Sequence, residues 1–292
     1  MSPTSRMEST AITSASPDHF RLIHWIFRVA FLMEFVGHGA FGIMGKAAWV
    51  PYFGVFGLSE PTAWHLMPII GTIDVTLGVV TFLRPMRGLI LYGSIWGLWT
   101  ALLRPLSGES FWETLERAGN YGIPLAFLLW SGWPRRASQW FARIRSDEGP
   151  LSTEARSRIF TVVRVSLALL LIGHGGFGAV VNKPVLAQHY GAVGLHALPF
   201  GSMPLVPAIG WFEIALGCAV LVWPAAGLLL FIAVWKIACE LLYPISGAPF
   251  WEFVERGGSY AAPLLLLVMA SYMRRAKTPA TSEVAAPKGV PA

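Results

Sequence analysis

Long apolar segments alternate with short polar ones along most of the chain. A membrane-spanning helix needs about 20 apolar residues, and a shorter segment can span where the bilayer thins locally. The pattern therefore predicts an all-α integral membrane protein with eight transmembrane helices. The apolar segments are residues 22–44, 63–83, 88–103, 118–133, 159–181, 203–223, 226–243 and 257–273.

The composition supports this interpretation. Hydrophobic residues make up 54% of the chain and charged residues only 13%, which is less charge than a soluble protein carries. Residues 1–20 and 275–292 lack an apolar run, so we expect disordered tails there. The first apolar segment is too long for a cleavable signal peptide. Cys218 and Cys239 both lie inside apolar segments, which argues against a disulfide framework.

Basic residues gather in alternate loops and predict the orientation. Residues 135–158, between the fourth and fifth segments, form a basic linker, and further lysines and arginines lie in the C-terminal tail. The positive-inside rule places both regions, and therefore both termini, in the cytoplasm. We interpret the formal net charge of +6 as an orientation signal and not as a nucleic-acid surface. A bacterial inner membrane fits this arrangement.

The second half of the chain repeats the first. Gly-His-Gly-Ala-Phe-Gly at residues 37–42 returns as Gly-His-Gly-Gly-Phe-Gly at residues 173–178, and Phe-Trp-Glu at 111–113 returns at 250–252. Two units of four helices have the same orientation, which implies a pseudo-two-fold axis along the membrane normal. The predicted units are residues 21–134 and 159–274.

Each unit resembles the DoxX-like superfamily of four-helix membrane proteins, which includes the DoxD and MauE types. The resemblance implies a role in membrane redox chemistry, as a small subunit of a sulfur- or quinone-linked oxidoreductase or as a helper in cofactor or thiol maturation. The residues that carry it are Arg28, Lys46, Gly71, Asp74, Gly78 and Tyr121, repeated as Arg164, Lys183, Gly210, Glu213, Gly217 and Tyr260.

His38 and His174, inside the repeated glycine motif, are the first candidate site residues. A neutral imidazole can bind a metal ion or haem or relay protons, and two copies related by a pseudo-two-fold axis could share one ligand. The alternative is a packed histidine bonded to a carbonyl, with glycines serving helix packing. The other histidines of the outer loops, His65, His189 and His196, are interpreted as solvated or interfacial.

A second candidate set begins the fourth helix of each unit and could bind a polar head group, a quinone carbonyl or a metal. Its members are Glu116, Arg117, Tyr121, Glu255, Arg256 and Tyr260. The alternative is structural, because carboxylates in a first helical turn favour the positive end of the helix dipole and can pair with a neighbouring arginine.

A third set consists of charged residues inside predicted spans, namely Asp74, Glu213, Glu34, Lys236 and Glu240. A charge at this depth costs about 2.5–3.5 kcal/mol even on the lenient insertion scale, so each is expected to be paired or to line a cavity. Lys236 and Glu240 are four residues apart and can pair along one helix face. The set either carries chemistry, such as proton transfer, or locks the two halves together.

The leading hypothesis is a component of a membrane redox system, with a quinone, haem or metal ion near the outer face and a partner oxidoreductase subunit supplying the main catalysis. Asp74 or Glu213 would pass protons. The alternatives are a small-solute or ion transporter, which duplicated halves and midplane charges also suit, and a membrane scaffold without chemistry. The sequence contains no Walker loop, dinucleotide-binding fingerprint, Cys-x-x-Cys or serine nucleophile elbow.

Overall fold

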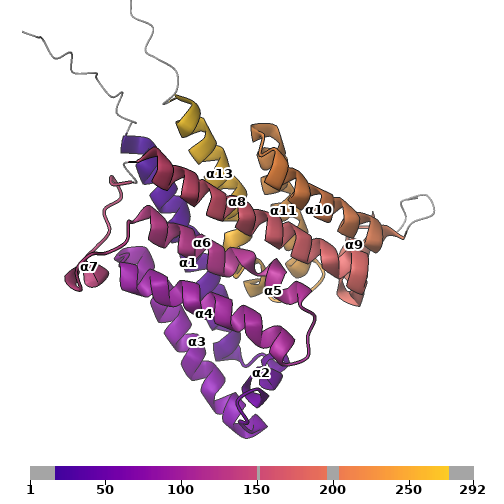
Figure 1. Ribbon diagram of the computed structural model, residues 1–292. Coiled ribbons are helices and arrows are strands. Elements are labelled where there is room, and N and C mark those ends of the chain that lie inside the picture. The colour runs from indigo at the N-terminus through magenta and orange to yellow at the C-terminus, as the bar shows by residue number, and fades with distance from the viewer. Residues whose placement is uncertain (1–16, 150–151, 196–203, 276–292) are drawn as a thin grey trace, which may run out of the picture.

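The computed structural model describes residues 17–149, 152–195 and 204–275, and nearly all of this part of the chain is helical (Figure 1). His196 lies outside the described residues. The helices are α1 (Pro17–Met44), η1 (Ala47–Trp49), α2 (Val50–Gly54), α3 (Glu60–Leu83), α4 (Arg87–Leu106), α5 (Trp112–Glu116), α6 (Ala118–Trp130), α7 (Ser138–Phe141), α8 (Thr153–Gly176), η2 (Phe177–Val181), α9 (Pro184–Ala192), α10 (Leu205–Val222), α11 (Ala226–Ile245), α12 (Trp251–Val254) and α13 (Gly257–Arg275).

Six of the described helices have the length and hydropathy of a membrane span: α1, α3, α4, α8 with η2, α10 and α11. The prediction of an all-α, multi-pass membrane protein is confirmed at this level, whereas eight spans were expected. The difference lies in the fourth helix of each half: α6 has 13 residues and is too short, whereas α13 has 19 residues and falls short in hydropathy. Short α5 and α12 precede α6 and α13, so Glu116 and Glu255 lie at helix ends and not within a continuous span.

Local signals explain where the long helices begin and end. The hydroxyls of Ser59 and Ser152 accept hydrogen bonds from the third backbone amide beyond them and cap α3 and α8. Pro85 and Pro224 follow the ends of α3 and α10, where a continuing helix would lose a hydrogen bond. Helix α1 begins at Pro17, inside the segment expected as a tail.

Glycines let the first two long helices of each half approach closely. A Cβ added at Gly71 of α3 would meet the backbone of Gly39 and Gly42 in α1, and one added at Gly210 of α10 would meet the backbone of Gly175 and Gly178. With so little room between the backbones, only glycine fits at these crossings. The crossings set which side chains of the paired helices face each other.

The two halves exchange contacts across the bundle. Helix α1 packs on α12 and α13, while α8 packs on α5 and α6. The start of α6 meets the start of α13, where a Cβ on Gly258 would touch the backbone of Gly119. The largest apolar core draws on both halves, with Phe27 and Phe127 from the first and Leu167, Leu171 and Leu265 from the second.

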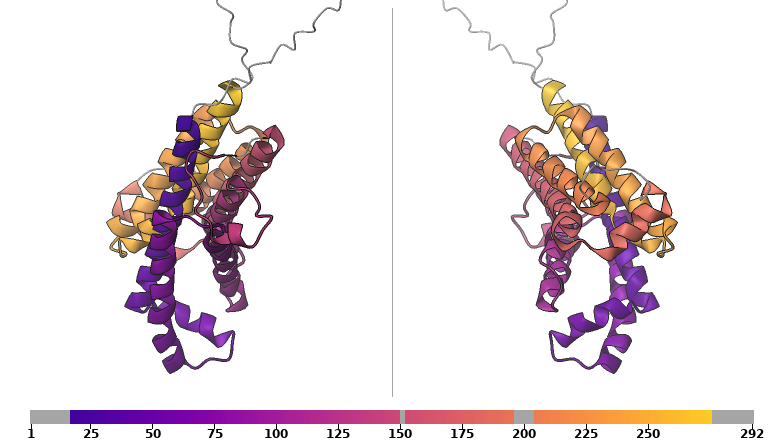
Figure 2. Two further views of the ribbon diagram at one scale, coloured as in Figure 1. Left: turned by 90° about the vertical axis from the view of Figure 1, so that its left-hand side faces the viewer. Right: turned by 90° about the vertical axis from the view of Figure 1, so that its right-hand side faces the viewer.

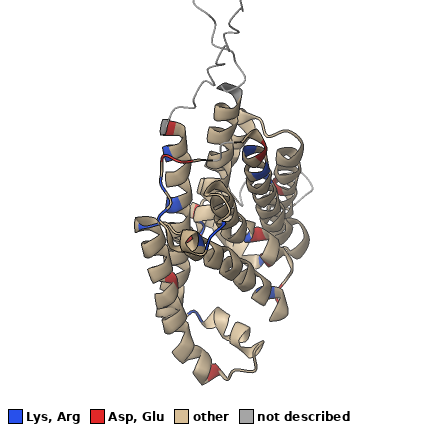
Figure 3. Cartoon of the chain, turned by 60° about the vertical axis from the view of Figure 1, so that its left-hand side comes forward, with Lys and Arg blue, Asp and Glu red and all other residues tan. Residues whose placement is uncertain are grey.

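The ends of the described chain lie together at one end of the bundle (Figure 2). Phe20 near the start of α1 contacts Tyr272 near the end of α13, with ring centroids 5.6 Å apart. Charged residues are sparse along the long helices, and several lie in the interior between them (Figure 3). The interior charges therefore need partners, and these partners define the candidate site.

Candidate functional site

Each histidine of the repeated glycine motif pairs with the acidic residue of the neighbouring helix. Nδ1 of His38 lies 2.8 Å from Oδ2 of Asp74, and Nδ1 of His174 lies 2.5 Å from Oε2 of Glu213. The glycine crossings cause both pairings, because Asp74 and Glu213 lie one helical turn beyond Gly71 and Gly210. A buried carboxylate next to an imidazole satisfies the expectation that charges at this depth are paired.

The other glycine of each motif touches the opposite half. A Cβ on Gly37 would overlap the backbone of Glu255, and a Cβ on Gly173 would overlap that of Glu116. The glycines at 37 and 173 therefore bring each histidine helix against the short helix of the other half. Each motif thus lies at a contact between halves, with its histidine turned toward the acidic residue of its own half.

Two lysine–glutamate pairs join the halves near these contacts. Nζ of Lys46 lies 2.7 Å from Oε1 of Glu252, and Lys183 binds Glu113 in the same way. Each lysine also lies over a phenylalanine ring, at 3.8 Å from the centroid of Phe41 and 3.7 Å from that of Phe177. Cation–π contact of this kind adds to the ion pair.

Arg256 is the centre of a buried network of charges. It lies 2.8 Å from Glu240, 2.9 Å from Glu252 and 3.3 Å from Glu255, measured between nitrogen and oxygen atoms. Lys236 pairs with Glu240 at 2.7 Å, and both side chains are fully buried. The prediction that these two residues pair along one helix face is confirmed.

Arg117, which matches Arg256 in the sequence repeat, has fewer partners. Its guanidinium lies 3.4 Å from Glu116, and its Nε has no hydrogen-bond partner among the described residues. Burial would raise the pKa of Glu116, but Arg117 and Arg256 oppose this and hold the pKa at about 2. Glu116 is therefore a carboxylate at neutral pH, while Arg117 keeps free donor capacity.

A polar cavity of about 410 Å³ lies where the halves meet. Its charged lining includes both interhalf lysine–glutamate pairs, together with Arg104, Glu109, Glu116, Arg117 and Arg256. Tyr52 donates a hydrogen bond to Glu109 at one side of it. The wall therefore carries charges of both signs, most of them already paired.

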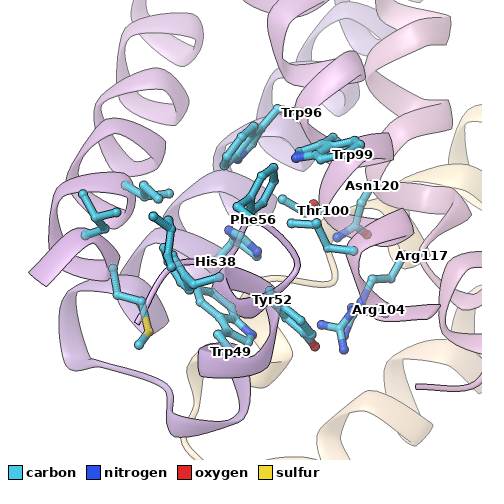
Figure 4. A pocket seen from close by; sticks show the side chains of 16 residues that line it. His38, Trp49, Tyr52, Phe56, Trp96, Trp99, Thr100, Arg104, Arg117 and Asn120 are labelled. Atoms are coloured by element: carbon cyan, nitrogen blue, oxygen red, sulfur yellow. The ribbon is translucent and has the colours of Figure 1, made fainter. Parts of the chain in front are cut away.

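A second, largely apolar cavity of about 260 Å³ lies within the first half, next to His38 (Figure 4). His38 stacks on Trp49 at a ring separation of 4.4 Å, and its side chain is 19% exposed against 3% for His174. Trp96 and Trp99 lie on one side of the cavity, and Arg104, Arg117 and Asn120 on another. Among the described residues, only Asp74 forms a hydrogen bond with the His38 ring, so Nε2 has no hydrogen-bond partner.

The second half differs from the first at two buried positions of α11. Gly97 and Ala101 stand where the repeat places Lys236 and Glu240, so the first half lacks the bulk of that ion pair. In the second half, Trp235 donates to Glu213 at 2.9 Å. His189, expected to be solvated or interfacial, is buried there against Tyr243, with ring centroids 4.4 Å apart, because α9 folds back onto α11.

The remaining predicted residues take varied positions. The hydroxyl of Tyr121 donates a hydrogen bond to the carbonyl of Thr114, and the hydroxyl of Tyr260 donates one to the carbonyl of Phe253. Each tyrosine therefore connects the long helix of its half to the short helix that precedes it. Glu34 is buried beside Gly97. Within the described residues, no group of three His, Cys, Asp or Glu side chains converges as a metal site. His38 and His174 each pair with a separate carboxylate.

Sequence reasoning missed most of the cavity wall. Trp49, Tyr52, Trp99, Arg104 and Asn120 were not singled out, although they line the cavity. One signal was present, because these positions hold Leu186, His189, Ala238, Tyr243 and Ser259 in the second half. The two halves therefore differ in residue type at these five positions of the His38 cavity.

Comparison of the chain with known protein families, characterised proteins and solved structures finds no match.

Proposed function

We propose that this chain binds a quinone in the His38 cavity and serves a membrane redox system there. One observation carries the proposal: an imidazole backed by a buried carboxylate opens into an apolar, tryptophan-lined cavity that has arginine and amide donors on another side. Ligand cavities of this kind are mostly apolar, with a few polar groups that orient the ligand. A flat ring with polar oxygens at opposite ends suits both surfaces.

The residues suggest how the ligand would be held. Asp74 accepts a hydrogen bond from Nδ1–H of His38, which leaves Nε2 to accept the hydroxyl proton of a quinol and stabilises the imidazolium that forms. The Nε2–H of this imidazolium would then donate a charged hydrogen bond to the carbonyl oxygen of the quinone. Arg104, Arg117 and Asn120 supply donors for an oxygen at the other end of the ring. The electrons of the quinol would pass to a partner oxidoreductase subunit, in line with the DoxX-like resemblance. The donor set suits a quinone better than a metal ion, because three ligating side chains do not converge among the described residues.

The proposal includes the full architecture: eight helices, with α6 and α13 as the fourth span of each DoxX-like unit, around a pseudo-two-fold axis along the membrane normal. The paired contacts support it, since Lys46–Glu252 mirrors Lys183–Glu113 and Gly37–Glu255 mirrors Gly173–Glu116. The adjacent ends of α1 and α13 fit termini on one side of the membrane, which the positive-inside rule makes the cytoplasmic side of an inner membrane.

The test is quinone binding by protein purified in mild detergent. A quinone bound beside Trp49, Trp96 and Trp99 should quench tryptophan fluorescence. We expect His38→Ala to weaken binding by about tenfold or more, since it removes a hydrogen bond worth about 1.5–3 kcal/mol when one partner is charged. His65→Ala is the matched control, because His65 is exposed on α3 and lies outside the cavity. Equal affinity in His38→Ala and the unaltered protein would reject the proposal.

A transporter of small solutes or ions is the second candidate, favoured by the polar cavity between the halves. It predicts solute or ion flux in proteoliposomes that falls when Asp74→Asn or Glu213→Gln removes a buried charge. Flux that is unchanged in both variants would count against transport. A protein that shows neither quinone binding nor flux would fit the scaffold hypothesis.

A further inference from the structure

Two apolar hollows lie between α3 and α4. One is the His38 cavity, and the other is a shallow groove of about 340 Å³. The groove lies toward the α3–α4 turn and is lined by Thr72, Ile73, Thr76, Leu77, Val80, Leu89 and Tyr92.

The lining residues form one continuous track along both helices. On α3 the cavity is lined by Leu66, Met67 and Ile70, and the groove continues the same face through Ile73, Leu77 and Val80. On α4 the track runs from Leu89 and Tyr92 to Trp96, Trp99 and Leu103. Spacings of three and four residues keep these positions on one helix face. From residue 66 to residue 80 the track covers about 21 Å, at 1.5 Å per residue.

The groove is open to the outside of the bundle. Its two threonine hydroxyls both have hydrogen-bond partners within α3. Ile73 is 49% exposed and Tyr92 is 44% exposed. The hydroxyls of Thr72 and Thr76 donate to the carbonyls of Pro68 and Thr72, both at 2.7 Å, so they face the groove already satisfied. Helix α3 packs mainly on α1, and α4 packs mainly on α6. Helices α3 and α4 therefore make few contacts with each other, and the groove lies between them.

We propose that the ligand of the His38 cavity is a lipid-tailed quinone, which enters laterally from the bilayer and lays its aliphatic tail in the α3–α4 groove. This inference rests on the proposed function, because it assigns the tail of the same ligand. The alignment of groove and cavity along the same faces of α3 and α4 selects this occupant over an ordinary lipid: a chain lying in the groove points toward the cavity that holds His38, where a ring with polar oxygens finds its partners.

The test compares two probes with the same head, a dimethoxy-methyl-benzoquinone without a tail and its decyl-tailed form, by quenching of tryptophan fluorescence in detergent. In the unaltered protein we expect the decyl probe to bind about tenfold more tightly than the head alone. Thr76→Phe, which fills the groove, should remove this gain and leave the affinity of the head unchanged. Leu89→Phe, from the opposite wall, should do the same.

Val79→Phe is the matched control, because Val79 is 40% exposed on α3 and outside the groove. Any change in the decyl probe's apparent affinity that comes only from partitioning of its tail into micelles should also appear in Val79→Phe. Equal affinity for both probes, or the same tail effect in Thr76→Phe and Val79→Phe, would overturn the inference and mean that the groove holds ordinary lipid only. Failure of the proposed function looks different: the head alone would then not bind, or would bind equally well to His38→Ala.

Discussion

The buried pair of Lys236 and Glu240 makes the sharpest prediction about stability, because its two members depend on each other unequally. Both side chains are fully buried, and Nζ lies 2.7 Å from Oε1. Glu240 has a second partner in Arg256 at 2.8 Å, whereas Lys236 has no other ion-pair partner among the described residues. Removing Glu240 therefore leaves the buried ammonium of Lys236 without an ion-pair partner, whereas removing Lys236 leaves Glu240 paired with Arg256.

The magnitudes follow from this asymmetry. Glu240→Met leaves an unpaired buried ammonium, which costs about 3–5 kcal/mol of unfolding free energy. Lys236→Met leaves Glu240 with Arg256 and removes one buried ion-pair contact, which costs about 1.5–3 kcal/mol. The double variant leaves no buried charge unpaired, because Arg256 keeps Glu252 and Glu255 as partners. It replaces the ion pair by apolar side chains of similar length. We therefore expect it to be more stable than Glu240→Met alone.

The assay is unfolding in mixed micelles with increasing SDS, followed by tryptophan fluorescence, on all four members of the double-mutant cycle. The coupling between the two positions should be about 2 kcal/mol or more. Additive losses, or a Lys236→Met variant as unstable as Glu240→Met, would refute the argument that Arg256 supports only the carboxylate.

Two further predictions concern packing and pH. Gly71→Ala should cost about 1–3 kcal/mol by forcing α1 and α3 apart, whereas Gly227→Ala, which has open space around it, should leave the unfolding midpoint unchanged; similar midpoints in both would contradict the close crossing. The pKa of Glu116 is lowered from 4.5 to about 2 in the folded protein, so its stabilising effect is complete above pH 4.5 and is lost as the pH falls toward 2. The stability difference between the unaltered protein and Glu116→Gln, measured by thermal unfolding, should therefore shrink over this range, and a constant difference would disprove the assignment.

The two histidine–carboxylate pairs are alike in geometry and differ in surroundings. His174 and Glu213 are sealed by Trp235 and by the ion pair of α11, while His38 opens into a cavity. If the His38 cavity binds the ligand as proposed, the first histidine–carboxylate pair serves binding and the second serves packing. On this proposal the second dyad supports the bundle, and one chain binds one quinone.

Much of the architecture could be predicted from the amino-acid sequence alone. Continuous apolar runs determine spanning helices, because an unpaired backbone group in lipid is too costly for any other structure of such length. The same cost predicts that Asp74, Glu213, Lys236 and Glu240 are buried with partners, and the structure confirms this burial and pairing. The spacing of four residues was sufficient to predict the Lys236–Glu240 pair. The resemblance and the repeat architecture stay predictions.

Only the tertiary structure decided which residues meet. His38 and Asp74 are 36 residues apart, and Lys46 and Glu252 are 206 apart. Their contacts depend on glycine crossings whose angle and depth no local pattern specifies. The break at Arg117 was missed because residues 112–116 were read as the first turn of the fourth helix, and the cavity was missed because it is lined by residues of α1, η1, α2, α3, α4 and α6 together. Local periodicity decides which face of a helix is apolar, but the space between helices depends on how all their side chains pack together.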